Sequence, residues 1–165
     1  MEELHNYRQK LLEMLQNLPG TYQQTLAHLS PEQVHQTLPV EQSTIYQVAV
    51  HVRDAAQDTY LPVIKTLLEA SRTKNAPLPE AGTSAHHATV DESIQQICTS
   101  MRQLQSQVLD SLQASPTSAW SAAMRHPAWG VRTLQWWVEQ YLAHGRAHLH
   151  QIRSHLDAIN PTTAS

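Results

Sequence analysis

The stretch Tyr141-Leu-Ala-His144-Gly-Arg-Ala-His148-Leu-His-Gln151-Ile152 decides how this sequence folds. It belongs to a longer run in which apolar residues recur at every third or fourth position, the pattern of the buried face of an amphipathic helix. That run comprises Leu134, Trp137 or Val138, Tyr141, His144, His148, Ile152, His155 and Ile159. His144 and His148 replace apolar residues in the middle of this face, and their four-residue spacing directs both imidazoles to the same side of the helix.

Two interpretations of this histidine pair follow from its chemistry. Imidazoles one helical turn apart can bind one metal ion at the ~2.0–2.1 Å of a zinc–nitrogen bond. Alternatively, both are core histidines whose ring nitrogens form hydrogen bonds with neighbouring helices. The metal interpretation requires a third ligand from elsewhere in the chain.

Composition and charge exclude several classes of protein. The 165 residues carry a formal net charge of −3 and no basic run, which argues against nucleic-acid binding. No apolar run approaches the ~18 residues of a membrane span, and the start Met-Glu-Glu does not resemble a signal peptide. The single cysteine, Cys98, allows no internal disulfide and is expected to be a small core residue. These features predict a soluble, cytoplasmic protein that does not enter the membrane.

Four long segments show helical spacing. They are residues 3–29, a segment from Ser43 or Thr44 to Leu68, a segment from the capping box Thr89–Glu92 to Ser115-Pro116, and a segment from Arg132 to Ile159. Because no strand signal accompanies them, they predict an all-α four-helix bundle over residues 1–160, with a frayed tail at 161–165. The long connections 71–88 and 115–131 allow crossovers, so the order of helix directions stays open.

Prolines and caps refine these boundaries. Pro19 predicts an interruption and a kink in the first helix, and Pro62 predicts a bend in the second. Ser30, followed by proline, is expected to cap a short extra helix. Thr44 and Gln47 form a capping box at the start of the second long helix.

The second long helix carries the third histidine, His51, on or at the edge of its buried face. Taken alone, this residue is more often a core histidine than a ligand. Facing helices of a bundle lie only ~8–10 Å apart, however, so it can meet the pair on the last helix. His150 points away from the pair, and His155 is too far along the helix axis. The sequence therefore supports three ligands, the number typical of a catalytic metal site with a position left for water or substrate.

Three segments together are similar to the motifs of one protein family. They are Leu29–Val34 followed by Ser43–His51, then His126-Pro-Ala-Trp-Gly130 through Thr133-Leu134, and His144-x3-His148-x2-Gln151-Ile152. Over roughly residues 5–157 the chain resembles the DinB superfamily of metal-binding four-helix bundles. The resemblance implies that His51, His144 and His148 bind one divalent metal, with zinc or nickel as first choices and iron or manganese as alternatives.

The resemblance also implies a function class and an assembly. Members look like metal-dependent hydrolases or transferases, some of which use a low-molecular-weight thiol, and they often form homodimers. For this chain it implies a small-molecule substrate and a metal-activated water or thiol as the nucleophile. Gln151, Trp129 and Tyr141 are the candidates for residues that support the metal or line its pocket. Gln42 and Gln57 depart from the family pattern, which leaves the substrate open.

A second interpretation comes from a different class of protein. In it, the chain is a non-catalytic bundle that a metal stabilises and that acts as a dimeric binding or stress-related protein. One flank of the last helix carries Trp136, Gln140, Ala143 and Ala147, whose small members let another helix approach closely. This flank suits a dimer face or a contact within the bundle equally.

Overall fold

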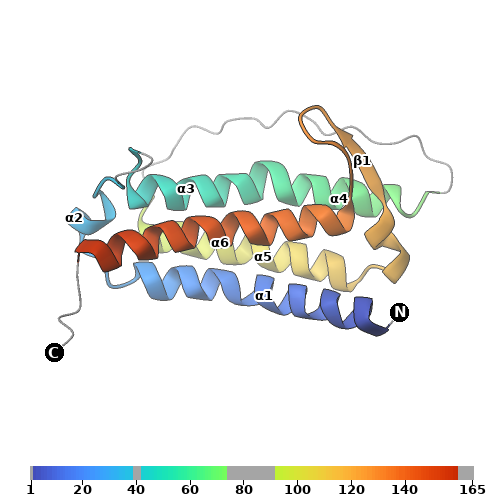
Figure 1. Ribbon diagram of the computed structural model, residues 1–165, viewed down its shortest axis with the longest axis horizontal. Helices are drawn as coiled ribbons and strands as arrows, with labels where there is room; N and C mark the ends of the chain where they lie inside the picture. The colour runs from blue at the N-terminus through green and yellow to red at the C-terminus, as the bar shows by residue number, and fades with distance from the viewer. Residues whose placement is uncertain (1, 39–41, 74–91, 160–165) are drawn as a thin grey trace.

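Long helical rods lie side by side along the length of the molecule (Figure 1). The computed structural model describes residues 2–38, 42–73 and 92–159, so the tail predicted at 161–165 lies outside the described residues. The elements are α1 (Glu2–Leu26), α2 (Pro31–Val34), α3 (Ile45–Ala55), the π-helical turn η1 (Ala56–Tyr60), α4 (Leu61–Ala70), α5 (Ile94–Gln113), the 3-10 turn η2 (Thr117–Ser121), β1 (Ala123–His126), β2 (Gly130–Thr133) and α6 (Leu134–Ile159). Because η1 joins α3 directly to α4, the rods are α1, α3–α4, α5 and α6, which confirms the predicted four-helix bundle.

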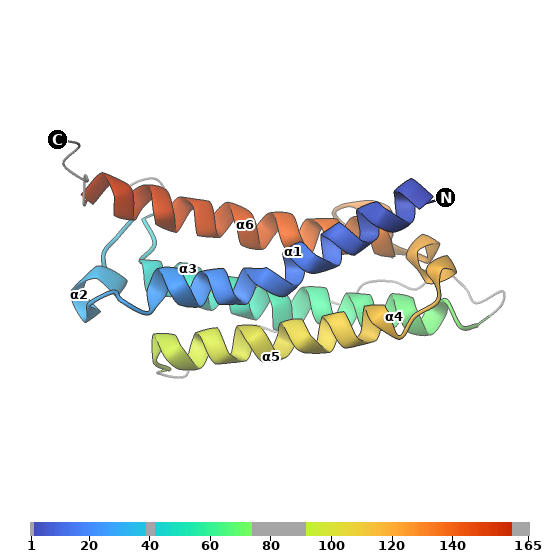
Figure 2. The same cartoon turned by 90° about the horizontal axis from the view of Figure 1, so that it is seen from below.

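The rods do not alternate strictly in direction. α1 packs against α5 and α6, and the same two helices pack against the α3–α4 rod. Figure 2 shows that α3–α4 and α5 run in the same direction, and that α1 and α6 both run in the opposite one. The long connection between α4 and α5 allows this arrangement, which the sequence leaves open.

One apolar face of each rod contributes to the core. Leu15, Tyr22, Ile64, Ile97 and Trp137 are among its largest fully buried side chains. Within the described ranges, no helix is both long and apolar enough to cross a lipid bilayer.

Cys98 also lies in this core, as the sequence predicts. Burial raises the pKa of its thiol, so the reactive thiolate is disfavoured. Cys98 is therefore a packing residue and not a nucleophile.

Two predicted helix caps are confirmed and a third is wrong. Ser30 caps α2 and Thr44 caps α3, each in a capping box with the glutamine three residues later. The capping box predicted at Thr89–Glu92 does not open α5. Its cap is Ser93, whose hydroxyl accepts a hydrogen bond from the backbone N–H of Gln96 at 3.2 Å; residues 89–91 lie outside the described residues.

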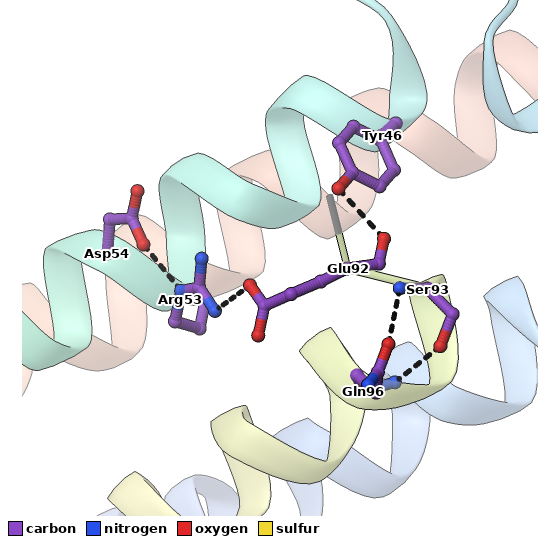
Figure 3. Close-up of polar contacts among 6 residues, drawn as sticks. All are labelled: Tyr46, Arg53, Asp54, Glu92, Ser93 and Gln96. Atoms are coloured by element: carbon purple, nitrogen blue, oxygen red, sulfur yellow. Dashed lines mark hydrogen bonds and ion pairs between the residues drawn. The ribbon is translucent and has the colours of Figure 1, made fainter. Parts of the chain in front are cut away.

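Glu92 instead connects α5 to the helix that carries His51 (Figure 3). Its carboxylate accepts a hydrogen bond from Nη1 of Arg53 at 2.6 Å, and its backbone carbonyl accepts one from the Tyr46 hydroxyl at 2.9 Å. Arg53 is buried and also pairs with Asp54 at 2.5 Å, so both neighbours compensate its charge. These contacts fix the position of α3 against α5.

The two internal prolines have different effects. Pro19 lies inside a continuous α1, so the interruption predicted there is wrong, although the helix bends along its length (Figure 2). Immediately before Pro62, where the sequence predicts a bend, the chain forms the π-helical turn η1. Proline has no N–H to donate to the carbonyl four residues earlier, and the wider turn accommodates that missing bond.

The connection between α5 and α6 contains a β-hairpin, contrary to the expectation of a chain without strands. β1 and β2 pair antiparallel, with Ala123 opposite Thr133 and His126 opposite Gly130. Gly130 has a φ of +67°, in the left-handed region where glycine is unstrained. Because β2 ends at Thr133, α6 begins at Leu134 and not at Arg132. Strands of four residues are too short to show a clear alternation in sequence.

Candidate metal centre

The three predicted histidines lie together where α3 faces α6. Nε2 of His51 lies 3.1 Å from Nε2 of His144, although the two residues are 93 positions apart in sequence. The ring centroid of His148 is 4.9 Å from that of His51 and 4.6 Å from that of His144. One ring nitrogen from each histidine lies within 4.8 Å of the others, so the three side chains could hold one metal ion.

The pair on α6 lies at the edge of the buried face, and the expectation that it occupies the middle is wrong. His144 and His148 are half-buried, and His51 is exposed. Gly145 and Leu149 are the buried residues at this level of α6. Gly145 lies against α1, where its carbonyl accepts a 2.6 Å hydrogen bond from the buried Tyr22 hydroxyl. Consequently, the histidines face the α3 side and are accessible to a ligand.

Gln151 orients one of the imidazoles. Nδ1 of His148 lies 2.7 Å from Oε1 of Gln151, and because an amide oxygen only accepts, Nδ1 carries the proton. In the neutral ring, Nε2 then keeps its lone pair, the form that a metal ion requires. Gln151, a candidate from the sequence, therefore lies in direct contact with one histidine of the triad.

Electrostatics keeps His144 neutral. Its pKa is lowered to about 4, mainly by burial and in the same direction by the neighbouring His148 and His51. At neutral pH this imidazole is therefore unprotonated and free to donate a lone pair.

The donor set fits a divalent transition metal. Two nitrogens bound to one tetrahedral ion at ~2.0–2.1 Å lie about 3.3 Å apart, close to the 3.1 Å between His51 and His144. Three neutral imidazoles suit zinc, nickel, iron or copper better than calcium or magnesium, which prefer oxygen ligands. Three protein ligands leave coordination positions for other molecules.

A pocket of about 540 Å³ opens beside the histidines. From the α3–η1 side it is lined by His51, Ala55, Thr59 and Tyr60. From α6 it is lined by Gln140, Ala143, His144 and Ala147. Trp129, in the turn of the β-hairpin, completes the lining. Its volume lies within the range of about 300–1,000 Å³ that is typical of small-molecule sites.

The structure places the remaining candidates in different ways. Trp129 lines the pocket, as predicted, and its ring stacks on His126 with 4.3 Å between centroids. Tyr141 is not part of the lining. It stacks on Tyr60 at 4.9 Å, and its hydroxyl donates a hydrogen bond to Oε1 of Gln105 at 2.9 Å. Tyr141 therefore supports the pocket wall from the core.

Tyr60 is an aromatic pocket residue that sequence reasoning does not identify. Its ring centroid lies 5.7 Å from that of His144, and burial raises the pKa of its hydroxyl to about 12. The available signal is Pro62, which marks the π-helical turn that ends at Tyr60. Gln140, Ala143 and Ala147, predicted as a dimer face or an internal contact, also prove to line the pocket.

Comparisons with known proteins agree with this geometry. A family model described as the DinB superfamily matches residues 3–152. Among solved structures, the chain is similar to YfiT from Bacillus subtilis, with a TM-score of 0.77 and 15% sequence identity over 92% of this chain and 87% of that one. YfiT is described as a probable metal-dependent hydrolase with an unusual four-helix bundle topology. A search of curated proteins found no match.

Proposed function

This chain belongs to the DinB superfamily, and we propose that it is a metal-dependent enzyme that acts on a small molecule as a hydrolase or transferase. The observation that carries this proposal is that His51 and His144 belong both to the histidine triad and to the pocket lining. In the proposal, His51, His144 and His148 hold one divalent ion, with zinc or nickel as first choices and iron or manganese as alternatives. The description of YfiT supports the same class.

Each residue of the site has a definable role. A divalent ion bound by the three imidazoles would act as a Lewis acid and would lower the pKa of a bound water or thiol. Gln151 holds the proton of His148 on Nδ1, and burial keeps His144 neutral. Tyr60 retains its hydroxyl proton at neutral pH, because burial raises its pKa to about 12. These residues position the ligands before any substrate binds.

The pocket favours an electrophile that is neutral and has an apolar part. Among the described residues, those that line it include no Asp, Glu, Lys or Arg side chain, and Trp129 and Tyr60 provide aromatic surface. Apolar walls favour an apolar electrophile and the carbon chain of a thiol over water. We therefore place transfer of a low-molecular-weight thiol to an electrophile first among the reactions to test, and hydrolysis second.

The test combines metal analysis with activity. The protein purified without chelator is expected to contain about one divalent ion per chain, measured by inductively coupled plasma mass spectrometry. It is then assayed for consumption of glutathione or cysteine with 1-chloro-2,4-dinitrobenzene, and for hydrolysis of neutral esters and amides. His51→Ala and His144→Ala should each lose the metal and the activity.

His150→Ala is the matched control, because His150 lies on the same helix but is exposed and outside the triad. This variant should keep both metal and activity. Full metal content in His51→Ala and His144→Ala would show that these histidines are packing residues. A stoichiometric metal without turnover of any substrate class would favour the non-catalytic alternative.

The alternative is a metal-stabilised binding or stress-related protein that acts as a homodimer. Ala143 and Ala147 support it, since both are exposed on α6 and allow close approach of another helix. Sedimentation of the metal-loaded protein at micromolar concentration is expected to show a dimer, about twice the 18.6 kDa chain mass.

The cytoplasm is the compartment we propose, because the one cysteine is buried and needs no oxidising environment.

A further inference from the structure

A buried arginine lies away from the histidine triad, at one end of the bundle. The N-terminal part of α1, the C-terminal end of α5 and the turn η2 meet at this end (Figure 2). Arg8 of α1 lies here and is only 8% exposed. Its guanidinium stacks over the ring of Trp120 in η2, with 5.0 Å between Cζ and the ring centroid.

Every hydrogen bond of Arg8 goes to a neutral acceptor. Nε and Nη2 donate to Oε1 of Gln135 at 3.2 and 3.0 Å, and Nη1 donates to the backbone carbonyl of Thr117 at 3.5 Å. Within residues 2–38, 42–73 and 92–159, no carboxylate forms an ion pair with Arg8. Gln135 links Arg8 indirectly to a carboxylate, because it also donates from Nε2 to Oε1 of Glu139 at 3.1 Å.

Arg8 therefore differs from the other buried arginine, Arg53. Both are less than 10% exposed, but Arg53 pairs directly with Asp54 and Glu92. A buried charge is costly unless an opposite charge compensates it. Arg8 also has five N–H donors, and the three bonds above leave part of this capacity for another acceptor.

A cavity of about 240 Å³ adjoins the Arg8 side chain. Leu12, Leu112 and Trp120 form apolar parts of its wall, whereas Arg8, Gln9 and Gln113 contribute polar groups. The volume lies below the range of about 300–1,000 Å³ typical of drug-sized ligands, so only a small molecule fits. The cavity thus combines the guanidinium of Arg8, the imidazole of His5, amide and hydroxyl side chains, and apolar surface.

We propose that this cavity is a second ligand site, which binds a small carboxylate with an apolar group. The carboxylate lies against the planar guanidinium of Arg8, which matches two oxygens in one plane. The apolar group lies against Leu12, Leu112 and Trp120. A monoanion fits better than a phosphate dianion, because the described lining holds one Lys or Arg side chain, Arg8, and beside it only one imidazole, that of His5. This site shares no lining residue with the triad pocket.

The test uses benzoate as the probe and benzamide as its neutral counterpart, at constant ionic strength. Two-dimensional ¹H–¹⁵N NMR of the full chain follows the Nε–H of Arg8 and the indole N–H of Trp120. Benzoate should shift both signals with saturation, whereas benzamide should bind at least ten-fold more weakly. Arg8→Gln should weaken benzoate binding by at least ten-fold, and Arg8→Lys, which keeps the charge but not the fork, by an intermediate factor.

The matched control is Arg125→Gln, which removes an exposed arginine from β1 and should leave benzoate binding within two-fold of wild type. Equal binding of benzoate and benzamide would overturn the proposal. So would shifts that occur only at the triad pocket, or tighter binding of inorganic phosphate than of benzoate at the Arg8 signals. If Arg8→Gln does not fold, the wild-type shifts and Arg8→Lys still decide the question, independently of whether the triad is catalytic.

Discussion

Replacing Gln151 with leucine tests whether the histidine triad is built to bind a metal. The substitution removes the acceptor 2.7 Å from Nδ1 of His148 and keeps a side chain of similar size. His148 can then adopt either tautomer and can rotate. Removing a partner of this kind typically costs 10–100-fold in metal affinity, or about 1.4–2.7 kcal/mol. We expect a loss of this size for zinc in Gln151→Leu.

The same substitution has a smaller effect on the metal-free protein. The hydrogen bond to His148 lies at a half-buried position, and its loss costs about 0.5–1.5 kcal/mol. The free energy of unfolding should therefore fall more in the zinc-bound protein than in the metal-free protein, because binding to the native state adds to stability. Competition with a chromogenic chelator measures the affinity, and chemical denaturation of both forms measures the stability.

Two control variants sharpen this test. Gln151→Glu keeps an acceptor on His148 and should bind zinc at least as tightly as wild type. Gln140→Leu changes another glutamine of α6 that lines the pocket but is outside the triad, and should bind zinc within two-fold of wild type. The reasoning is refuted if Gln151→Leu also stays within two-fold, because His148 would then not depend on this hydrogen bond.

Three further predictions concern the packing and titration of the same region. Tyr22→Phe removes the 2.6 Å bond to Gly145 and should cost about 1 kcal/mol, a fall in Tm of about 2–4 °C by calorimetry. Gly145→Ala places a Cβ 2.5 Å from Cδ2 of Leu18. Overpacking costs about 1–3 kcal/mol, whereas the higher helix propensity of alanine contributes about 1 kcal/mol of stability. Calorimetry should therefore show a net destabilisation of up to about 2 kcal/mol. In the metal-free folded protein the pKa of His144 is lowered to about 4. As the pH falls, the unfolded chain therefore binds a proton at His144 before the folded chain does. Stability should therefore be full above pH ~6.5 and fall towards pH 4, with a shallower fall in His144→Leu, as melting curves across this range would show.

The fold was predictable because its signals are local. Ser30 and Thr44 each stand three residues before a glutamine, and both capping boxes form. At the start of α5 two such patterns compete within a few residues, and Ser93 prevails over Thr89. The carboxylate of Glu92 forms an ion pair with Arg53 instead, a partner 39 positions away that no local pattern can reveal.

The cluster of three histidines was predictable from the sequence, but its surroundings were not. Histidines at positions 144 and 148 share a helix face by spacing alone, and His51 required only the closeness of two bundle helices. The sequence did not predict which face of α6 is most deeply buried around the histidines. That face includes Gly145, and its position beside Leu18 and Tyr22 depends on how α1 packs. Two strands of four residues were likewise missed, since their pairing depends on a turn at Gly130 and on the adjoining α6.

The π-helical turn explains how the pocket and the triad come to share one wall. In a regular α-helix, residues four positions apart lie on one face, so His51 is followed by Ala55 and then by Thr59. η1 closes over five residues instead of four, which turns Tyr60 toward the same side. Both Thr59 and Tyr60 indeed line the pocket with His51 and Ala55. Pro62 favours this wider turn, so a residue outside the pocket lining helps to determine which aromatic ring stands beside His144.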